Sequence, residues 1–157
     1  MNAERAREFL LGLPHVVEAE QWGGLLYWVG DKAIGGRTCV MMNLDAGVGN
    51  PVSMPAGPER FAELCERDGI IPAPYMARNF WVAVERWDAL LDREWQDEFK
   101  AAHALTFAKL PPGTKKVLAM PKAEQKRVVA ERRKALTAKE AAKKAKARTP
   151  IRTESSD

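Results

Sequence analysis

Apolar and polar residues follow two different periods along this chain, and each period predicts a different kind of element. Short apolar or alternating stretches predict extended segments over 16–22, 25–29, 33–34, 38–44 and 51–54. Glycine-containing turns separate them. Strands spaced this closely, with no helix between them, favour an antiparallel meander over a parallel α/β sheet.

Helical spacing occurs on both sides of these strands. It predicts a first helix over 2–11 with Asn2 as its N-cap, a second that begins at Gly57 and Pro58, and a third over 92–109. In each segment the apolar side chains share one side, as in a helix that packs on a sheet. We therefore expect an α+β fold in which helices cover one face of an antiparallel sheet.

Residues 72–85 form the most unusual stretch of the sequence. Pro72 and Pro74 fix an extended approach, and 80–85 is rich in the aromatic and β-branched residues that favour strands. Tyr75, Arg78 and Trp81 place two aromatic rings and a cation close together. These three residues form a candidate binding pocket, in which Arg78 would hold a phosphate or carboxylate group. The alternative is structural, with Trp81 in the core and Arg78 paired with a carboxylate.

Charge divides the chain near residue 113, after the break at 110–113 that contains two prolines. Residues 1–113 contain 11 Lys and Arg against 16 Asp and Glu, a net charge of −5. Residues 114–157 contain 14 Lys and Arg against 5 Asp and Glu, a net charge of +9, and no aromatic residue. We expect a folded domain over 1–113 and a basic tail over 114–157. Val128, Val129 and Leu136 are the only large apolar residues of its 122–147 segment, so we expect a solvated helix that exchanges with disorder and frays by Thr149 and Pro150.

Catalytic and metal-binding patterns are missing from the sequence. It has no nucleophile elbow, no phosphate-binding glycine loop and no His-Glu-x-x-His motif, so we predict a binding protein rather than an enzyme, without a cofactor or metal. Two cysteines and the absence of an apolar leader or membrane-length segment indicate a cytoplasmic protein. One acidic set could bind a metal, although a solvated helix face explains it more simply: Asp88, Asp92, Glu94, Asp97 and Glu98.

Several short motifs occur in order through residues 3–112. They are Leu13-Pro14-His15, Gly30-Asp31-Lys32, Val52-Ser53-Met54 before Pro58-Glu59-Arg60-Phe61, the segment from Pro74-Tyr75 through Trp81-Val82, and Lys109-Leu110-Pro111. In this order they resemble the MmcQ/YjbR family of small bacterial proteins. The resemblance implies an antiparallel sheet with helices on one side, like the bacterial frataxin homologue, and it implies DNA binding. Members usually have a lysine where this chain has Pro55.

The basic tail provides the leading functional hypothesis, which is contact with the phosphates of a nucleic acid without sequence readout. DNA is the expected partner ahead of RNA, on the strength of the resemblance, and no membrane is expected. The residues assigned to this contact are Arg78, Lys115, Lys116, Lys122, Lys126, Arg127, Arg132, Arg133 and Lys134. The competing hypothesis is a module that binds a small ligand or a protein in the pocket near Tyr75, Arg78 and Trp81.

Overall fold

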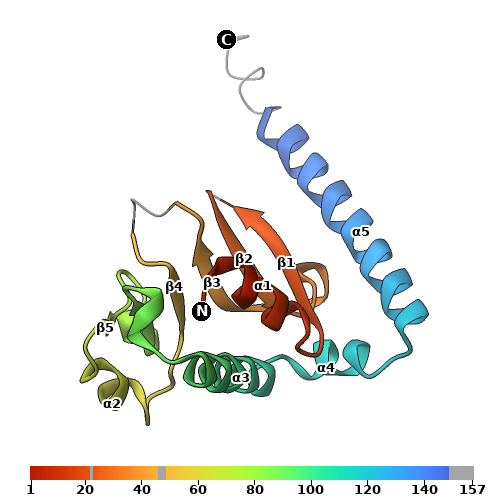
Figure 1. The fold of residues 1–157 in the computed structure, drawn as a ribbon. Helices are drawn as coiled ribbons and strands as arrows, with labels where there is room; N and C mark the ends of the chain where they lie inside the picture. The colour runs from red at the N-terminus through yellow and green to blue at the C-terminus, as the bar shows by residue number, and fades with distance from the viewer. Residues whose placement is uncertain (22, 46–48, 149–157) are drawn as a thin grey trace, which may run out of the picture.

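Six strands form one fully antiparallel sheet in the computed structural model, which describes residues 1–21, 23–45 and 49–148 (Figure 1). Their order across the sheet is β1-β2-β3-β4-β6-β5, so β6 lies between β4 and β5. The strands are β1 (Val16–Gln21), β2 (Gly24–Val29), β3 (Arg37–Asn43), β4 (Val52–Pro55), β5 (Ile70–Pro72) and β6 (Trp81–Val84).

Helices pack on this sheet and extend beyond it, which confirms the α+β fold class. The α-helices are α1 (Ala3–Leu11), α2 (Phe61–Cys65), α3 (Asp92–Ala108), α4 (Pro112–Leu118) and α5 (Lys122–Arg148). Three short 3₁₀ helices connect other elements: η1 (Lys32–Ile34), η2 (Ala77–Asn79) and η3 (Trp87–Ala89). None of the helices in the described residues is both long enough and apolar enough to span a bilayer.

The main core lies between the sheet and the helices α1 and α3. Leu10 of α1 and Trp95 and Phe99 of α3 are fully buried against Tyr27 of β2 and Val40 of β3. Burying a side chain of this size contributes about 1.5–3 kcal/mol. Of the apolar side predicted for 92–109, Trp95, Phe99 and Ala102 face the core, whereas Leu105 is only partly buried.

The ladder between β3 and β4 is short. Only Met41↔Ser53 and Met42↔Val52 are in register, whereas β4 continues to pair with β6 as far as Pro55↔Trp81. The first half of β3 is thus paired with β2 but not with β4. The two strands diverge from this point (Figure 1), and a cavity lies where they separate.

The strand predicted over 80–85 is shorter at both ends, because β6 begins at Trp81 and stops at Val84, before Glu85. Phe80 does not begin the strand, because it ends η2 with left-handed backbone angles (φ 60°). A left-handed conformation is strained for a bulky side chain. Within β6, Val82 faces the main core and Trp81 faces a smaller apolar cluster on the opposite side of the sheet.

Two further predictions were wrong in detail. Ala33 and Ile34 belong to η1 and not to a strand, because the Asp31 carboxylate accepts a hydrogen bond from the Ala33 N–H (2.9 Å) and caps a helical turn. The second helix begins at Phe61 after a turn, not at Gly57. The end predicted for the strand at residue 22 lies outside the described residues.

Packing continues past the predicted domain boundary at residue 113. Val117 and Leu118 of α4 are buried in the main core, and the Thr114 hydroxyl donates a 2.6 Å hydrogen bond to the Ile34 carbonyl. Val128 and Val129 of α5 also pack on this core. The start of the basic tail is therefore attached to the domain, whereas the fraying predicted at 149–150 lies outside the described residues.

Candidate functional site

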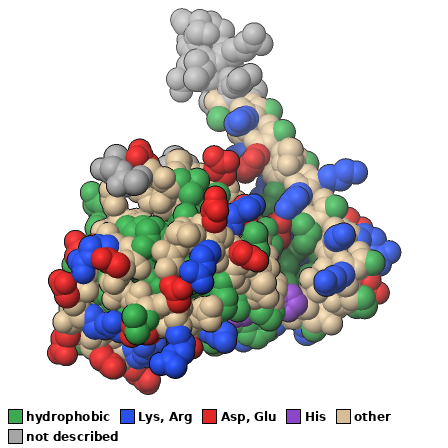
Figure 2. Space-filling model, viewed as in Figure 1, with side chains coloured by type: hydrophobic (Ala, Val, Ile, Leu, Met, Phe, Trp, Pro, Cys, Tyr) green, Lys and Arg blue, Asp and Glu red, His purple; other side chains and the backbone are tan. Residues whose placement is uncertain are grey.

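Helix α5 carries most of the cations assigned to nucleic-acid contact. It is a single helix of 27 residues, about 40 Å long at 1.5 Å per residue. Every residue from 130 to 147 is exposed. Lys and Arg side chains are distributed along it in Figure 2, whereas acidic and basic side chains are mixed over the rest of that face.

The attached side of α5 contains Gln125, Val128 and Val129. The Gln125 amide donates hydrogen bonds to the carbonyl oxygens that end α4, those of Leu118 (3.0 Å) and Met120 (2.7 Å). At 100° per residue, these three side chains define one side of the helix. The side chains of Arg127 and Lys134 fall on the opposite side and are exposed. Lys126 is also exposed, but it lies on the flank of the helix and lines a hollow together with Val129.

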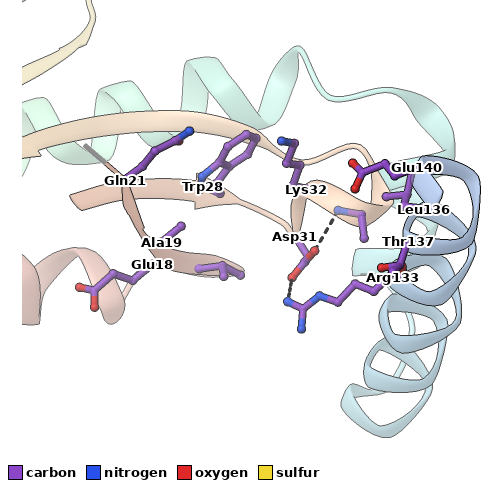
Figure 3. A pocket seen from close by; sticks show the side chains of 12 residues that line it. Glu18, Ala19, Gln21, Trp28, Asp31, Lys32, Arg133, Leu136, Thr137 and Glu140 are labelled. Atoms are coloured by element: carbon purple, nitrogen blue, oxygen red, sulfur yellow. Dashed lines mark hydrogen bonds and ion pairs between the residues drawn. The ribbon is translucent and has the colours of Figure 1, made fainter. Parts of the chain in front are cut away.

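Arg133 differs from the other predicted contact residues because it already has an anionic partner. It extends from α5 to form an ion pair with Asp31 (Figure 3). Asp31 is mostly buried, with 12% of its side chain exposed, and it also caps η1. This pair closes one end of a groove between α5 and the β1–β2 side of the sheet. The charge of Arg133 is therefore partly neutralised before any nucleic acid binds.

The remaining predicted tail cations occupy two environments. Lys115 of α4 is half-buried: its ammonium group donates to the Ala108 carbonyl (3.0 Å) and lies 5.7 Å from the centre of the Phe107 ring. This cation–π contact gives Lys115 a structural role. Fully solvated positions are occupied by Lys116, Lys122 and Arg132.

The acidic set considered for metal binding is divided among separate arginines. Its ion pairs are Asp88 with Arg86 (2.9 Å), Asp92 with Arg5 (2.9 Å), Glu98 with Arg60 (2.5 Å), and Glu94 with Arg67. Arg67 and the Leu91 N–H donate hydrogen bonds that lower the pKa of Glu94 to about 2. No three His, Cys, Asp or Glu side chains among the described residues gather closely enough to hold a metal ion.

The pocket predicted near Tyr75, Arg78 and Trp81 contains only two of these residues. Arg78 and Trp81 line the cavity between β3 and β4, together with Arg37 and Lys109. Tyr75 is fully exposed and is not part of this lining. Trp81 itself is 8% exposed and packs with Ala83, so its ring is both core and cavity wall.

The histidines and cysteines have structural surroundings. The imidazole rings of His15 and His103 each stack with the Phe107 ring at a centre-to-centre distance of 6.5 Å, and His103 Nε2 is 2.7 Å from the Pro14 carbonyl oxygen. Burial lowers the pKa of His15, with a smaller contribution from His103. Burial raises the pKa of Cys39 to about 12, which keeps it a thiol at neutral pH.

Comparison of the structure with solved structures gives one clear similarity. The crystal structure of the Deinococcus radiodurans protein DR2400, which has a DUF419 domain, superposes with a TM-score of 0.64. The match covers 75% of this chain and 88% of DR2400 at 21% sequence identity. The two proteins share a fold. DUF419 is the MmcQ/YjbR family, so the architecture implied by the sequence motifs is confirmed. No family model matches the chain, and no curated protein matches it.

Three participants in these sites were missed by the sequence analysis. Arg37 and Lys109 join Arg78 at the cavity, and Asp31 binds Arg133. Arg37 and Lys109 stand in different elements from Arg78, so no local pattern connects them. The position of Asp31 in a turn after a glycine does indicate that it could cap a short helix. Its pairing with Arg133 of α5, however, depends on tertiary structure.

Proposed function

We propose that the protein associates with nucleic acid without reading its sequence, through the exposed cations of α5. The observation that supports this most strongly is the arrangement of Arg127 and Lys134. They lie opposite the side of α5 that is attached to the domain, so a polyanion can reach them without displacing the helix. Over its length, α5 has eleven Lys or Arg residues and three Glu.

The physical driving force is the release of counterions from the phosphate backbone. A helix of about 40 Å is longer than one turn of duplex DNA, about 34 Å, so several of its cations can meet phosphates at once. Such contacts position a protein on nucleic acid without specifying bases. α5 has no aromatic residue, so base stacking is not part of the proposal. DNA is the proposed partner ahead of RNA because of the family resemblance.

The test compares two doubly substituted proteins that lose the same charge. Arg127→Gln with Lys134→Gln removes two exposed cations of α5, and Arg93→Gln with Lys100→Gln removes two exposed cations of α3. Binding to a mixed-sequence DNA duplex is measured over a range of salt concentrations. The α5 variant should reduce the slope of log K against log salt by up to about 2, and the α3 variant should leave it near the wild-type value.

Equal slopes for the two variants would contradict the assignment to α5. Substitution is a better test than removal of residues 114–157, because Val117 and Leu118 belong to the core and their loss would disturb folding. Repeating the titration with an RNA duplex tests the preference for DNA. Under this proposal the protein acts in the cytoplasm as a binding protein rather than as an enzyme.

A second candidate function is the binding of a small ligand at the cavity that Arg78 and Trp81 share. The observation that favours it is the gathering of Arg37, Arg78 and Lys109 around one hollow of about 470 Å³, a volume that can hold a small ligand. Tyr75 is not included, since it does not line this cavity. The chemistry of the cavity determines which kind of ligand it suits.

A further inference from the structure

Three cations surround the cavity between β3 and β4, and they come from three separate elements. Arg37 begins β3, Arg78 lies in η2, and Lys109 is the C-cap of α3. None of the described residues that line the cavity is acidic. From Val40 back to Arg37, β3 is no longer paired with β4, which leaves an opening between the two strands. The C-terminal end of α3 lies at this opening.

These cations contrast with most of the other arginines of the domain, Arg93 being the exception. Residues 1–113 have an excess of acidic residues, and five of their arginines form ion pairs: Arg5, Arg7, Arg60, Arg67 and Arg86. Arg37, Arg78 and Lys109 form no ion pair within 1–21, 23–45 and 49–148. Like charges around one opening repel each other, and an anion between them removes that repulsion.

Neutral groups of the same cavity add hydrogen-bond donors. Thr38, which has a hydroxyl group, and Asn79, which has an amide group, are among its lining residues. The indole Nε1 of Trp81 donates to no described group, and no polar side-chain atom is buried without a partner, so this N–H remains accessible. The Thr106 hydroxyl, by contrast, already donates to the Ala102 carbonyl at 2.9 Å.

We propose that this cavity binds a phosphate group. A phosphate monoester carries a charge of about −1.5 to −2 at neutral pH and three acceptor oxygens, whereas a single carboxylate would neutralise only one of the three cations. Two guanidinium groups can each donate paired hydrogen bonds to phosphate oxygens, with the lysine as a third charge. The volume of about 470 Å³ leaves room for more than the phosphate itself.

Two sources can supply this phosphate: a small phosphorylated molecule such as a mononucleotide, or the backbone of a nucleic acid. The cavity is formed by β3, β4, η2, β6 and α3, without α5. The inference therefore does not depend on the function proposed for α5. The wall formed by Trp81 and Phe80 would contact the organic part of either ligand.

The experiment measures binding of pyrophosphate, a 5′-mononucleotide and a DNA duplex to the full-length protein at constant ionic strength, with acetate as the monovalent control. Arg78→Gln and Lys109→Gln remove cations of the cavity, and Arg93→Gln removes an exposed arginine of α3 outside it. Pyrophosphate should raise the melting temperature of the wild type in a saturable way. Arg78→Gln should weaken its binding at least about tenfold, because a hydrogen-bonded charge contributes about 1.5–3 kcal/mol.

The probes distinguish the two sources. Weaker binding of both pyrophosphate and mononucleotide to the two cavity variants supports a small phosphorylated ligand. Weaker binding of the duplex alone, beyond the change caused by Arg93→Gln, supports a backbone phosphate. The proposal is overturned if neither cavity variant differs from Arg93→Gln with any probe, or if acetate matches pyrophosphate. The α5 double variant should keep wild-type pyrophosphate binding, which separates this result from failure of the proposed function.

Discussion

Arg133 and Asp31 form an ion pair across 102 positions of sequence, and this contact ties the basic helix to the rest of the protein. Asp31 uses its other carboxylate oxygen to cap η1, so one side chain fixes both a turn next to the sheet and the course of α5. The orientation of α5 is thus determined by a polar contact as well as by the packing of Val128 and Val129.

Arg133→Gln should loosen the attachment of α5. An ion pair whose arginine is largely exposed contributes about 0.2–1 kcal/mol, so amide hydrogen exchange over 122–130 should become faster by up to about fivefold. Lys134→Gln is the matched control, because the Lys134 side chain forms no ion pair with the described residues, and hydrogen exchange in this variant should stay at the wild-type rate. Identical exchange in both variants would mean that the pair contributes nothing to docking.

Glu94 should make stability depend on pH in the acidic range. Its pKa is about 2 in the folded protein, against an ordinary value of 4.5, because Arg67 and the Leu91 N–H stabilise the charged form. A carboxylate whose pKa is lowered by folding stabilises the folded protein fully above about pH 4.5, and this stabilisation is lost as the pH falls toward 2. Glu94→Gln should therefore be less stable than the wild type at pH 7, and the difference should shrink between pH 4.5 and 2.

Urea unfolding at a series of pH values measures this difference. Glu59→Gln is a suitable control, since Glu59 is exposed and is in none of the ion pairs of the described residues. A Glu94→Gln difference that stays constant down to pH 2 would show that the ion pair is not its source.

The two cysteines should react with alkylating reagents at different rates. Cys39 is fully buried and burial raises its pKa to about 12, whereas Cys65 is partly exposed and its pKa is raised less strongly by burial. Because the thiolate is the reactive form, iodoacetamide at pH 8 should modify Cys65 first and reach Cys39 only through unfolding. Mass spectrometry of a labelling time course gives both rates, and equal rates in the native protein would argue against the burial of Cys39.

Gly36 should tolerate no side chain. A Cβ atom there would lie 1.9 Å from the Gly30 carbonyl oxygen, a backbone contact that cannot be relieved by rotating a side chain. Gly36→Ala should destabilise the fold by about 3 kcal/mol or more. Gly113→Ala is the matched control, because no atom lies within 4 Å of its added Cβ, and it should change stability by at most about 1 kcal/mol. Both values come from urea unfolding curves.

Much of the fold follows from local patterns in the sequence. The apolar spacing of 92–109 and the short strands between 16 and 54 predict elements that the structure contains, because each has one face buried in the core. Two local errors had physical causes. A single turn of 3₁₀ helix at Lys32–Ile34 is too short to show a period, and a left-handed Phe80 is contrary to the preference of its side chain.

The candidate sites were less accessible to sequence reasoning. Arg78 was recognisable as a cation in an unusual stretch, but its association with Arg37 and Lys109 depends on how far β3 and β4 pair. Arg133 is likewise less available as a cation because it pairs with Asp31, and this pairing depends on where α5 packs on the domain. Strand register and helix docking are set by residues that are distant in sequence. Neither produces a local pattern of apolar and polar residues from which it could be predicted.

The brief contact between β3 and β4 also affects the mechanics of the sheet. The six strands are arranged as two three-stranded ribbons, β1-β2-β3 and β4-β6-β5, which pair with each other only at Met41 and Met42. Helix α3 contacts β2, β3 and β4 and so spans both ribbons. The angle at which the ribbons open is therefore set by α3, and a shift of that helix would widen or narrow the cavity while leaving each ribbon intact.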